Sequence, residues 1–176
     1  ATNSKILSNL VVCGWRPVWQ EHPERLLARM MEIVSQRLPG STITFLNSVD
    51  PDEFTTLMVS NGLRRAADNG PNRVFEMHPP HQGIFIRHIQ GDAAQPPVLS
   101  PVVMETTVHT VIVLGTQANV RLGGRCRDTR VLNIMLLLRK LWGVKNEGVP
   151  MHIVGENNED MTARLALAPK RSGNVS

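Results

Sequence analysis

The sequence predicts an α/β protein with a doubly wound parallel sheet of about five strands. Short apolar runs alternate along the chain with segments of helical periodicity, as in a sheet covered on both faces. The first run, residues 10–13, stops at Gly14, as do the first strand and turn of nucleotide-binding α/β folds. With this strand at the centre, the expected arrangement is Rossmann-like, with strand order 3-2-1-4-5.

Length and composition indicate one folded domain with a substantial core. The chain has 176 residues, of which 41% are hydrophobic and 19% charged. We expect a polar lead-in over residues 1–8, a single domain over 9–168 and a flexible tail over 169–176. No apolar run approaches the roughly 20 residues that span a bilayer, and no signal peptide is visible. The two cysteines, Cys13 and Cys126, form no spaced pattern, which favours a reducing compartment.

The first strand and helix are marked by residue type. The β-branched pair Val11-Val12 favours a strand over a piece of buried helix. Residues 15–22 are expected to form a loop. Pro23 suits a first helical position, and the apolar residues after it recur at helical spacing until Pro39-Gly40 ends the helix.

The next segments are a strand, a capped helix and a long loop. Residues 41–47 predict the second strand. Asp50 is expected to cap a helix that runs to Met58 and resumes at Leu63. Residues 68–82 are rich in Gly, Pro, Asn and His, which indicates a loop.

The third and fourth strands are also bounded by glycines. Residues 84–89 predict the third strand, which ends before Gly91, and the prolines at 96–101 leave a short helix at most. Residues 107–114 predict the fourth strand, ended by Gly115.

The last third of the chain predicts a helix, a strand and a helix. Residues 128–142 are apolar nearly all round, so this helix should be buried on more than one side, and Gly143 is expected to close it. Residues 149–154 predict the fifth strand, and 161–167 a final helix.

Ligands bind such sheets at the carboxyl ends of the strands, beside the switch point between the first and fourth strands. The loops after the strands should therefore face a common crevice. The candidate ligand-binding residues there are Gly14, Trp15, Arg16, Asn47, Asp92 and Gly115.

The crevice does not match the dinucleotide fingerprint, which needs three glycines. This chain supplies only Gly14, and a bulky Trp15 follows where backbone should approach phosphate. The second strand ends at Asn47, so the ribose-binding acid is displaced or missing. These features argue against NAD in its usual pose. The competing interpretation is a Rossmann-like fold whose crevice is filled by its own Trp15 and Arg16.

The sequence carries no clear metal or catalytic signature. Three histidines lie near one another but match no zinc spacing: His78, His81 and His88. Three acids could offer oxygen ligands to calcium, although helix capping explains them as well: Asp50, Asp52 and Glu53. No nucleophile-base arrangement is visible, so we expect no enzyme. The net charge of +4 comes mostly from scattered arginines without tyrosine, so no nucleic-acid partner is expected.

Four segments resemble a known family. Residues 11–16, Val-Val-Cys-Gly-Trp-Arg, look like the opening of the regulatory domain of CASTOR/POLLUX-type ion channels. These domains are relatives of the RCK (TrkA-N-like) domains that gate potassium channels. Residues 38–41, 127–139 and 154–166 are similar too, so the likeness runs from about residue 9 to 167.

The resemblance implies a gating module on the cytosol-facing side of a membrane, with an organelle or the nuclear envelope as candidate locations. Such modules pair with copies of themselves or with RCK-like domains, and a ligand or calcium shifts their arrangement and acts on a channel pore domain. Without pore helices, the chain would be a fragment or an accessory subunit. The apolar helix offers a candidate interface, namely Leu137, Leu138 and Leu141. The alternative function is that of a soluble nucleotide (NAD)-binding protein or oxidoreductase.

Overall fold

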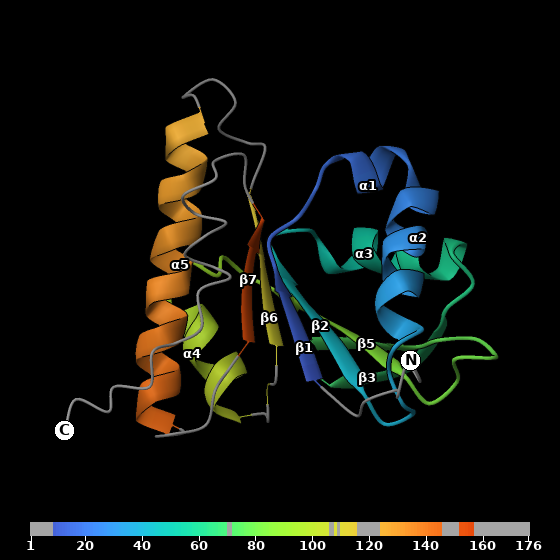
Figure 1. The fold of residues 1–176 in the computed structure, drawn as a ribbon. Coiled ribbons are helices and arrows are strands. Elements are labelled where there is room, and N and C mark those ends of the chain that lie inside the picture. Colours follow the sequence, from blue (N-terminus) through green and yellow to red (C-terminus); the bar gives the residue numbers. More distant parts are fainter. Residues whose placement is uncertain are drawn as a thin grey trace, which may run out of the picture.

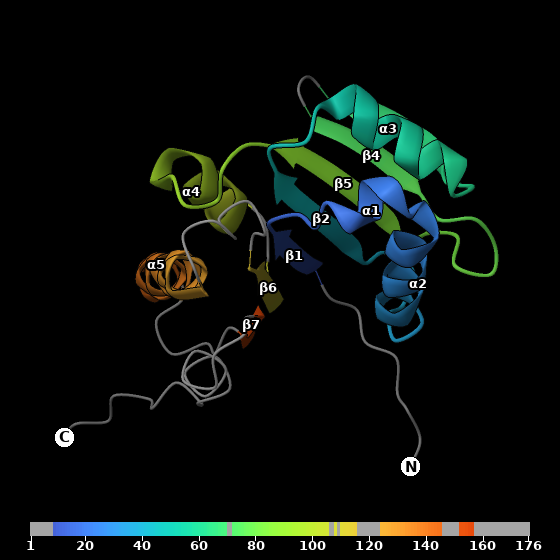
Figure 2. The same cartoon turned by 90° about the horizontal axis from the view of Figure 1, so that it is seen from above.

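A mixed β-sheet runs through the middle of the computed structural model, with helices on both faces (Figures 1 and 2). The structure describes residues 9–69, 72–105, 108, 110–115, 124–145 and 152–156. The strands are β1 (Asn9–Cys13), β2 (Thr42–Asn47), β3 (Arg64–Asn69), β4 (Asn72–Glu76), β5 (Phe85–Gln90), β6 (Thr110–Leu114) and β7 (His152–Glu156). The helices are α1 (Val18–Glu21), α2 (Pro23–Val34), α3 (Pro51–Ser60), α4 (Pro96–Glu105) and α5 (Gly124–Lys145).

The described residues form seven strands in the order β3-β4-β5-β2-β1-β6-β7. The prediction of about five strands in a purely parallel sheet was therefore wrong in count and in complete order. The part from β5 to β7 is parallel, with β1 at its centre between β2 and β6. Strands β3 and β4 are antiparallel and extend the sheet beyond β5.

The strands β3 and β4 occupy residues 64–69 and 72–76, where a loop over residues 68–82 and a helix resuming at Leu63 were expected. Strand β3 reads Arg-Arg-Ala-Ala-Asp-Asn and lies at the edge of the sheet, where a strand does not need apolar alternation. The polar composition of β3 therefore gave no sign of a strand, because β3 pairs with a neighbouring strand on one side only among the described strands. The ion pair between Arg64 and Glu76 joins the two strands.

Several helix boundaries also differ from the prediction. A short helix, α1, lies inside the expected loop 15–22, and α4 is a ten-residue helix despite Pro101. Gly143 lies within α5 rather than ending it. Helix α2 begins at Pro23 as predicted. The lead-in 1–8, the helix expected over 161–167 and the tail lie outside the described residues.

The helices α1, α2 and α3 cover one face of the sheet (Figure 2). Helix α2 buries Leu26, Met30 and Val34, which are spaced by one helical turn each. They pack with strand residues of the same face, such as Val12 and Phe45, in one hydrophobic core.

The helices α4 and α5 cover the other face over β1, β6 and β7 (Figure 2). Their core joins Leu99 of α4 and Leu138 of α5 to Val11, Val111 and other alternate strand residues. Helices on both faces make this an α/β fold of the predicted class. Among the helices that the structure describes, none has the length and apolar character needed to cross a bilayer.

Candidate functional site

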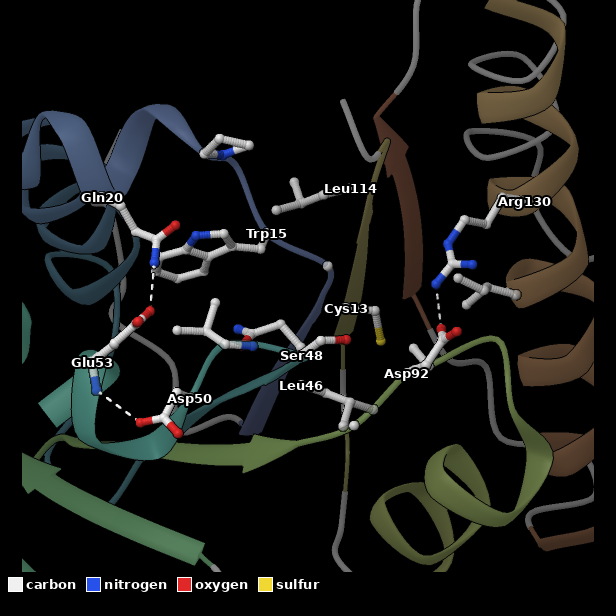
Figure 3. A pocket seen from close by; sticks show the side chains of 17 residues that line it. Cys13, Trp15, Gln20, Leu46, Ser48, Asp50, Glu53, Asp92, Leu114 and Arg130 are labelled. Carbon is white, nitrogen blue, oxygen red and sulfur yellow. Dashed lines mark hydrogen bonds and ion pairs between the residues drawn. The ribbon is translucent and has the colours of Figure 1, made fainter. Parts of the chain in front are cut away.

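A cavity of about 500 Å³ opens at the carboxyl ends of β1, β2, β5 and β6 (Figure 3). Its position is the crevice that the sequence predicts. Its walls include four of the candidate ligand-binding residues, Gly14, Trp15, Asn47 and Asp92. The other two candidates, Arg16 and Gly115, lie next to lining residues in sequence but are not among the residues that form the walls.

Gly14 ends β1 in a conformation that favours glycine, with φ of +110°. Its amide donates to the carbonyl of Leu46 across a distance of 2.9 Å, which ties the turn to β2. A Cβ atom at this position would lie 3.1 Å from Leu114 Cβ and 3.2 Å from Leu114 O. The glycine is therefore required by the contact of this turn with the end of β6.

We expect Gly14→Ala to lower the free energy of unfolding by about 1–3 kcal/mol, because the backbone is strained for an L side chain and Leu114 must move. Urea denaturation measures the loss. Gly143→Ala is the matched control: nothing lies within 4 Å of its added Cβ, and it sits in a helix. The control should be neutral or stabilising by up to about 1 kcal/mol. Equal stability of Gly14→Ala and the parent protein would contradict this account.

The turn after Gly14 offers few backbone donors to a phosphate. Pro17 has no N–H group, and the amides of Trp19 and Gln20 donate to carbonyls within the same turn, at 2.9 and 3.0 Å. Helix α1 is only four residues long. A dinucleotide pyrophosphate normally sits on free amides at this position, so the geometry agrees with the missing glycine fingerprint.

Trp15 forms part of the cavity wall and does not fill the crevice (Figure 3). Its ring lies edge-on to Trp19, with centroids 5.1 Å apart, and also contacts Phe54 at 5.9 Å. The indole Nε1 is buried and has no hydrogen-bond partner among the described residues. The competing interpretation of a crevice filled by Trp15 and Arg16 is therefore wrong, since an open cavity remains beside the ring.

Two carboxylates lie at one end of the cavity, both on the first turn of α3 (Figure 3). Asp50 is the predicted helix cap, since its Oδ1 accepts from the amides of Asp52 and Glu53 at 2.9 and 3.3 Å. Glu53 Oε2 accepts from Gln20 Nε2 at 3.0 Å. The second oxygen of each carboxylate has no partner among the described residues.

An ion pair between Asp92 and Arg130 lies at the other end of the cavity (Figure 3). Asp92 follows β5 and also accepts from the amide of Ala94 at 2.9 Å, while Arg130 lies on α5. The pair is half-buried and joins the loop between β5 and α4 to α5. The cavity is thus bounded by elements from both layers of helices.

A buried histidine, His88, lies beneath the cavity; neither its residue type nor its spacing in the sequence indicated this role. His88 lies on β5, has no exposed surface and stacks on Phe54, with ring centroids 4.2 Å apart. Its Nε2 lies 2.9 Å from Asn47 Oδ1. The pKa of His88 is lowered to about 4, first by burial and then by the charge of Arg73, while the charge of Asp50 opposes the shift.

The orientation of the Asn47 amide follows from its second partner. The amide of Val49, which can only donate, lies 3.1 Å from Asn47 Oδ1. That oxygen is therefore the acceptor, and neutral His88 donates to it from Nε2–H. The Asn47 Nδ2 group remains buried without a partner among the described residues. The sequence indicated a polar residue, Asn47, at the end of a strand. It did not indicate the contact with His88, which is 41 residues away in the chain.

The histidines and acids that the sequence analysis weighed as metal ligands do not converge. Within the described part of the chain, no group of His, Cys, Asp or Glu side chains has an arrangement that could hold a metal ion. Asp52 pairs with Arg73 at 2.8 Å outside the cavity, whereas Asp50 and Glu53 line it. His78 is exposed and His88 is buried, so the three histidines do not share one environment.

The three leucines predicted as an interface differ in exposure. Leu138 is completely buried in the core of this chain, so the expectation that it contacts another domain was wrong. Leu137 and Leu141 are partly buried against the same core, and their role in an interface stays a prediction. The neighbouring Leu136, which the sequence analysis did not single out, is 60% exposed.

No family model matches the chain, and a search of curated proteins also finds no match.

Proposed function

We propose that the chain is a ligand-sensing regulatory domain of the RCK-like type, from a CASTOR/POLLUX-like cation channel. The observation that carries the proposal is the Asp92–Arg130 ion pair at the edge of the cavity. A ligand in the crevice that alters this pair acts directly on α5. Because a ligand shifts an equilibrium by its differential affinity for two states, such a contact suffices to favour one position of the helix.

The surface that transmits the shift is the outer side of α5. Leu136 is exposed there, and Leu137 and Leu141 are partly exposed on the same helix. A partner domain that covers these side chains gains the free energy of apolar burial, about 25 cal/mol per Å². The proposed partners are copies of this domain or related domains attached to a channel pore.

We expect Leu136→Asp to abolish self-association without unfolding the chain, because the side chain is exposed. Mass measured by light scattering after size exclusion reports the oligomeric state, and circular dichroism reports the fold. Val59→Asp is the matched control, since Val59 is 54% exposed on α3 in the opposite layer. A folded Leu136→Asp variant with the oligomeric mass of the parent protein would show that α5 is not the interface.

The size and membrane partition of the natural gene product test the channel assignment. An immunoblot after carbonate washing should show a band far larger than 19.5 kDa that stays with the membrane. A free band near 19.5 kDa would contradict a single-chain channel. If the protein is released from the membrane by the wash and also binds no membrane protein, the channel assignment is wrong.

The alternative function, a soluble NAD-binding protein or oxidoreductase, is supported only by the position of the cavity. We expect no binding heat with NAD(H) or NADP(H) in calorimetry. In the turn after Gly14, the amides of Trp19 and Gln20 already donate to carbonyls of the same turn, and three carboxylates line the cavity walls. Saturable heat at one ligand per chain would reverse the order of the two proposals.

A further inference from the structure

The cavity walls have an uneven charge distribution. Among the described residues, the walls carry three carboxylates, Asp50, Glu53 and Asp92, and one cation, Arg130, which is already paired with Asp92. The remaining excess of negative charge lies at the α3 end, although the chain as a whole has a net charge of +4. The positive pole of α3 offsets only about half an elementary charge there. This end therefore favours a cationic group.

A second and independent observation concerns hydrogen-bond donors in the same walls. Asn47 is only 4% exposed, and its Nδ2 group has no acceptor among the described residues. Trp15 also lines the cavity and has a buried, unpartnered Nε1–H. Buried donors without acceptors are costly, and a ligand that supplies an acceptor removes the cost.

The middle of the cavity is apolar. Figure 3 shows Trp15, Leu46 and Leu114 between the carboxylate end at Glu53 and the ion pair at Asp92. A ligand that spans this region needs a short hydrocarbon body. A phosphate is disfavoured, because the turn after Gly14 offers few amides to bind it.

The geometry points to a small zwitterion of the amino-acid type as the ligand, with its cationic group at Asp50 and Glu53 and its carboxylate accepting from Asn47 Nδ2. This inference names the ligand class for the crevice in the proposed function and rests on that function. The cation forms charge-assisted hydrogen bonds with the free oxygens of both carboxylates. The hydrocarbon part lies along Trp15.

Calorimetry with two probes tests the assignment. L-Lysine carries two ammonium groups, a hydrocarbon chain and a carboxylate, whereas cadaverine has the same chain and both ammonium groups without the carboxylate. We expect saturable binding of L-lysine at one per chain, and weaker binding of cadaverine. Absence of saturable heat with both probes, or an equal response to calcium ions alone, would overturn the inference.

Isosteric variants locate the two contacts. Asp50→Asn keeps a capping side chain, and Glu53→Gln keeps the shape of the residue. Each should lower the affinity for both probes by about tenfold or more. The matched control is Asp52→Asn, which removes the same charge from the same turn of α3 but faces Arg73 outside the cavity. An equal loss in the control would show general charge attraction and contradict a site.

Asn47→Asp removes the hydrogen-bond donor of this side chain, Nδ2, and keeps the acceptor, Oδ1. The new carboxylate still accepts from Val49 N–H and His88 Nε2–H, so the fold is expected to persist, as checked by circular dichroism. The variant should lose affinity for L-lysine by about tenfold or more, and its affinity for cadaverine should not fall. Unchanged binding of L-lysine would overturn the contact with the carboxylate.

The two proposals fail in different measurements. If L-lysine does not bind while the natural product stays in washed membranes, the ligand class is wrong and the regulatory domain stands. If L-lysine binds with the expected losses in the variants but the product is a free 19.5 kDa chain without a membrane partner, the channel assignment is wrong and the ligand site stands.

Discussion

Phe54→Ala is expected to lower the free energy of unfolding by about 3–5 kcal/mol, the usual cost of removing a buried ring. Phe54 has no exposed surface and lies at the centre of the aromatic cluster beneath the cavity. Its ring centroid lies 5.7 Å from that of Phe45, 6.0 Å from that of Phe75 and 4.2 Å from that of His88. Alanine leaves a void that these packed side chains cannot fill without moving.

The substitution should also change the packing of the cavity wall, because Phe54 contacts Trp15 there. Urea unfolding measures the free energy, and tryptophan fluorescence of the folded variant reports the environment of the wall. The control is Val59→Ala on the same helix, where the side chain is 54% exposed and the loss should stay within about 0.5 kcal/mol. Equal losses for the two variants would show that the cluster does not hold α3 on the sheet.

The parallel part of the fold could be predicted from the sequence because its signals are local. The central strand β1 is buried on both faces over residues 10–13 and therefore contains a short apolar run there. The glycine after β1 and the aspartate before α3 mark a turn and a cap within a few residues of the strands. The antiparallel strands β3 and β4 could not be predicted in this way. Strand β3 is polar and lies at the edge of the sheet, where its only neighbour among the described strands is β4.

The candidate site was predictable only in part for the same reason. The position of Gly14, Asn47 and Asp92 follows from the rule that strand ends share one edge of a sheet. The pairing of Asn47 with His88 joins residues on two strands, and the contact of Asp92 with Arg130 joins a loop to a helix. Such contacts depend on tertiary packing, so no local pattern in the sequence contains them.

His88 should make the protein lose stability as pH falls from about 6.5 to about 4. Its pKa is lowered from 6.5 in the unfolded chain to about 4 in the folded chain, first by burial and then by the charge of Arg73. Above pH 6.5 the ring is neutral in both states, so the native state carries no penalty. Between the two pKa values the unfolded chain takes up a proton that the folded chain does not. Stability then falls, by a total on the order of 3 kcal/mol.

Urea unfolding at successive pH values between 7 and 4 measures this slope. In His88→Gln the slope over this range should become much shallower, although stability at pH 7 is lower because the stack on Phe54 is lost. His78→Gln is the control, since His78 is exposed, and it should keep the slope of the parent protein. A parent-like slope in His88→Gln would therefore assign the acid sensitivity to another group and contradict a buried neutral histidine beneath the cavity.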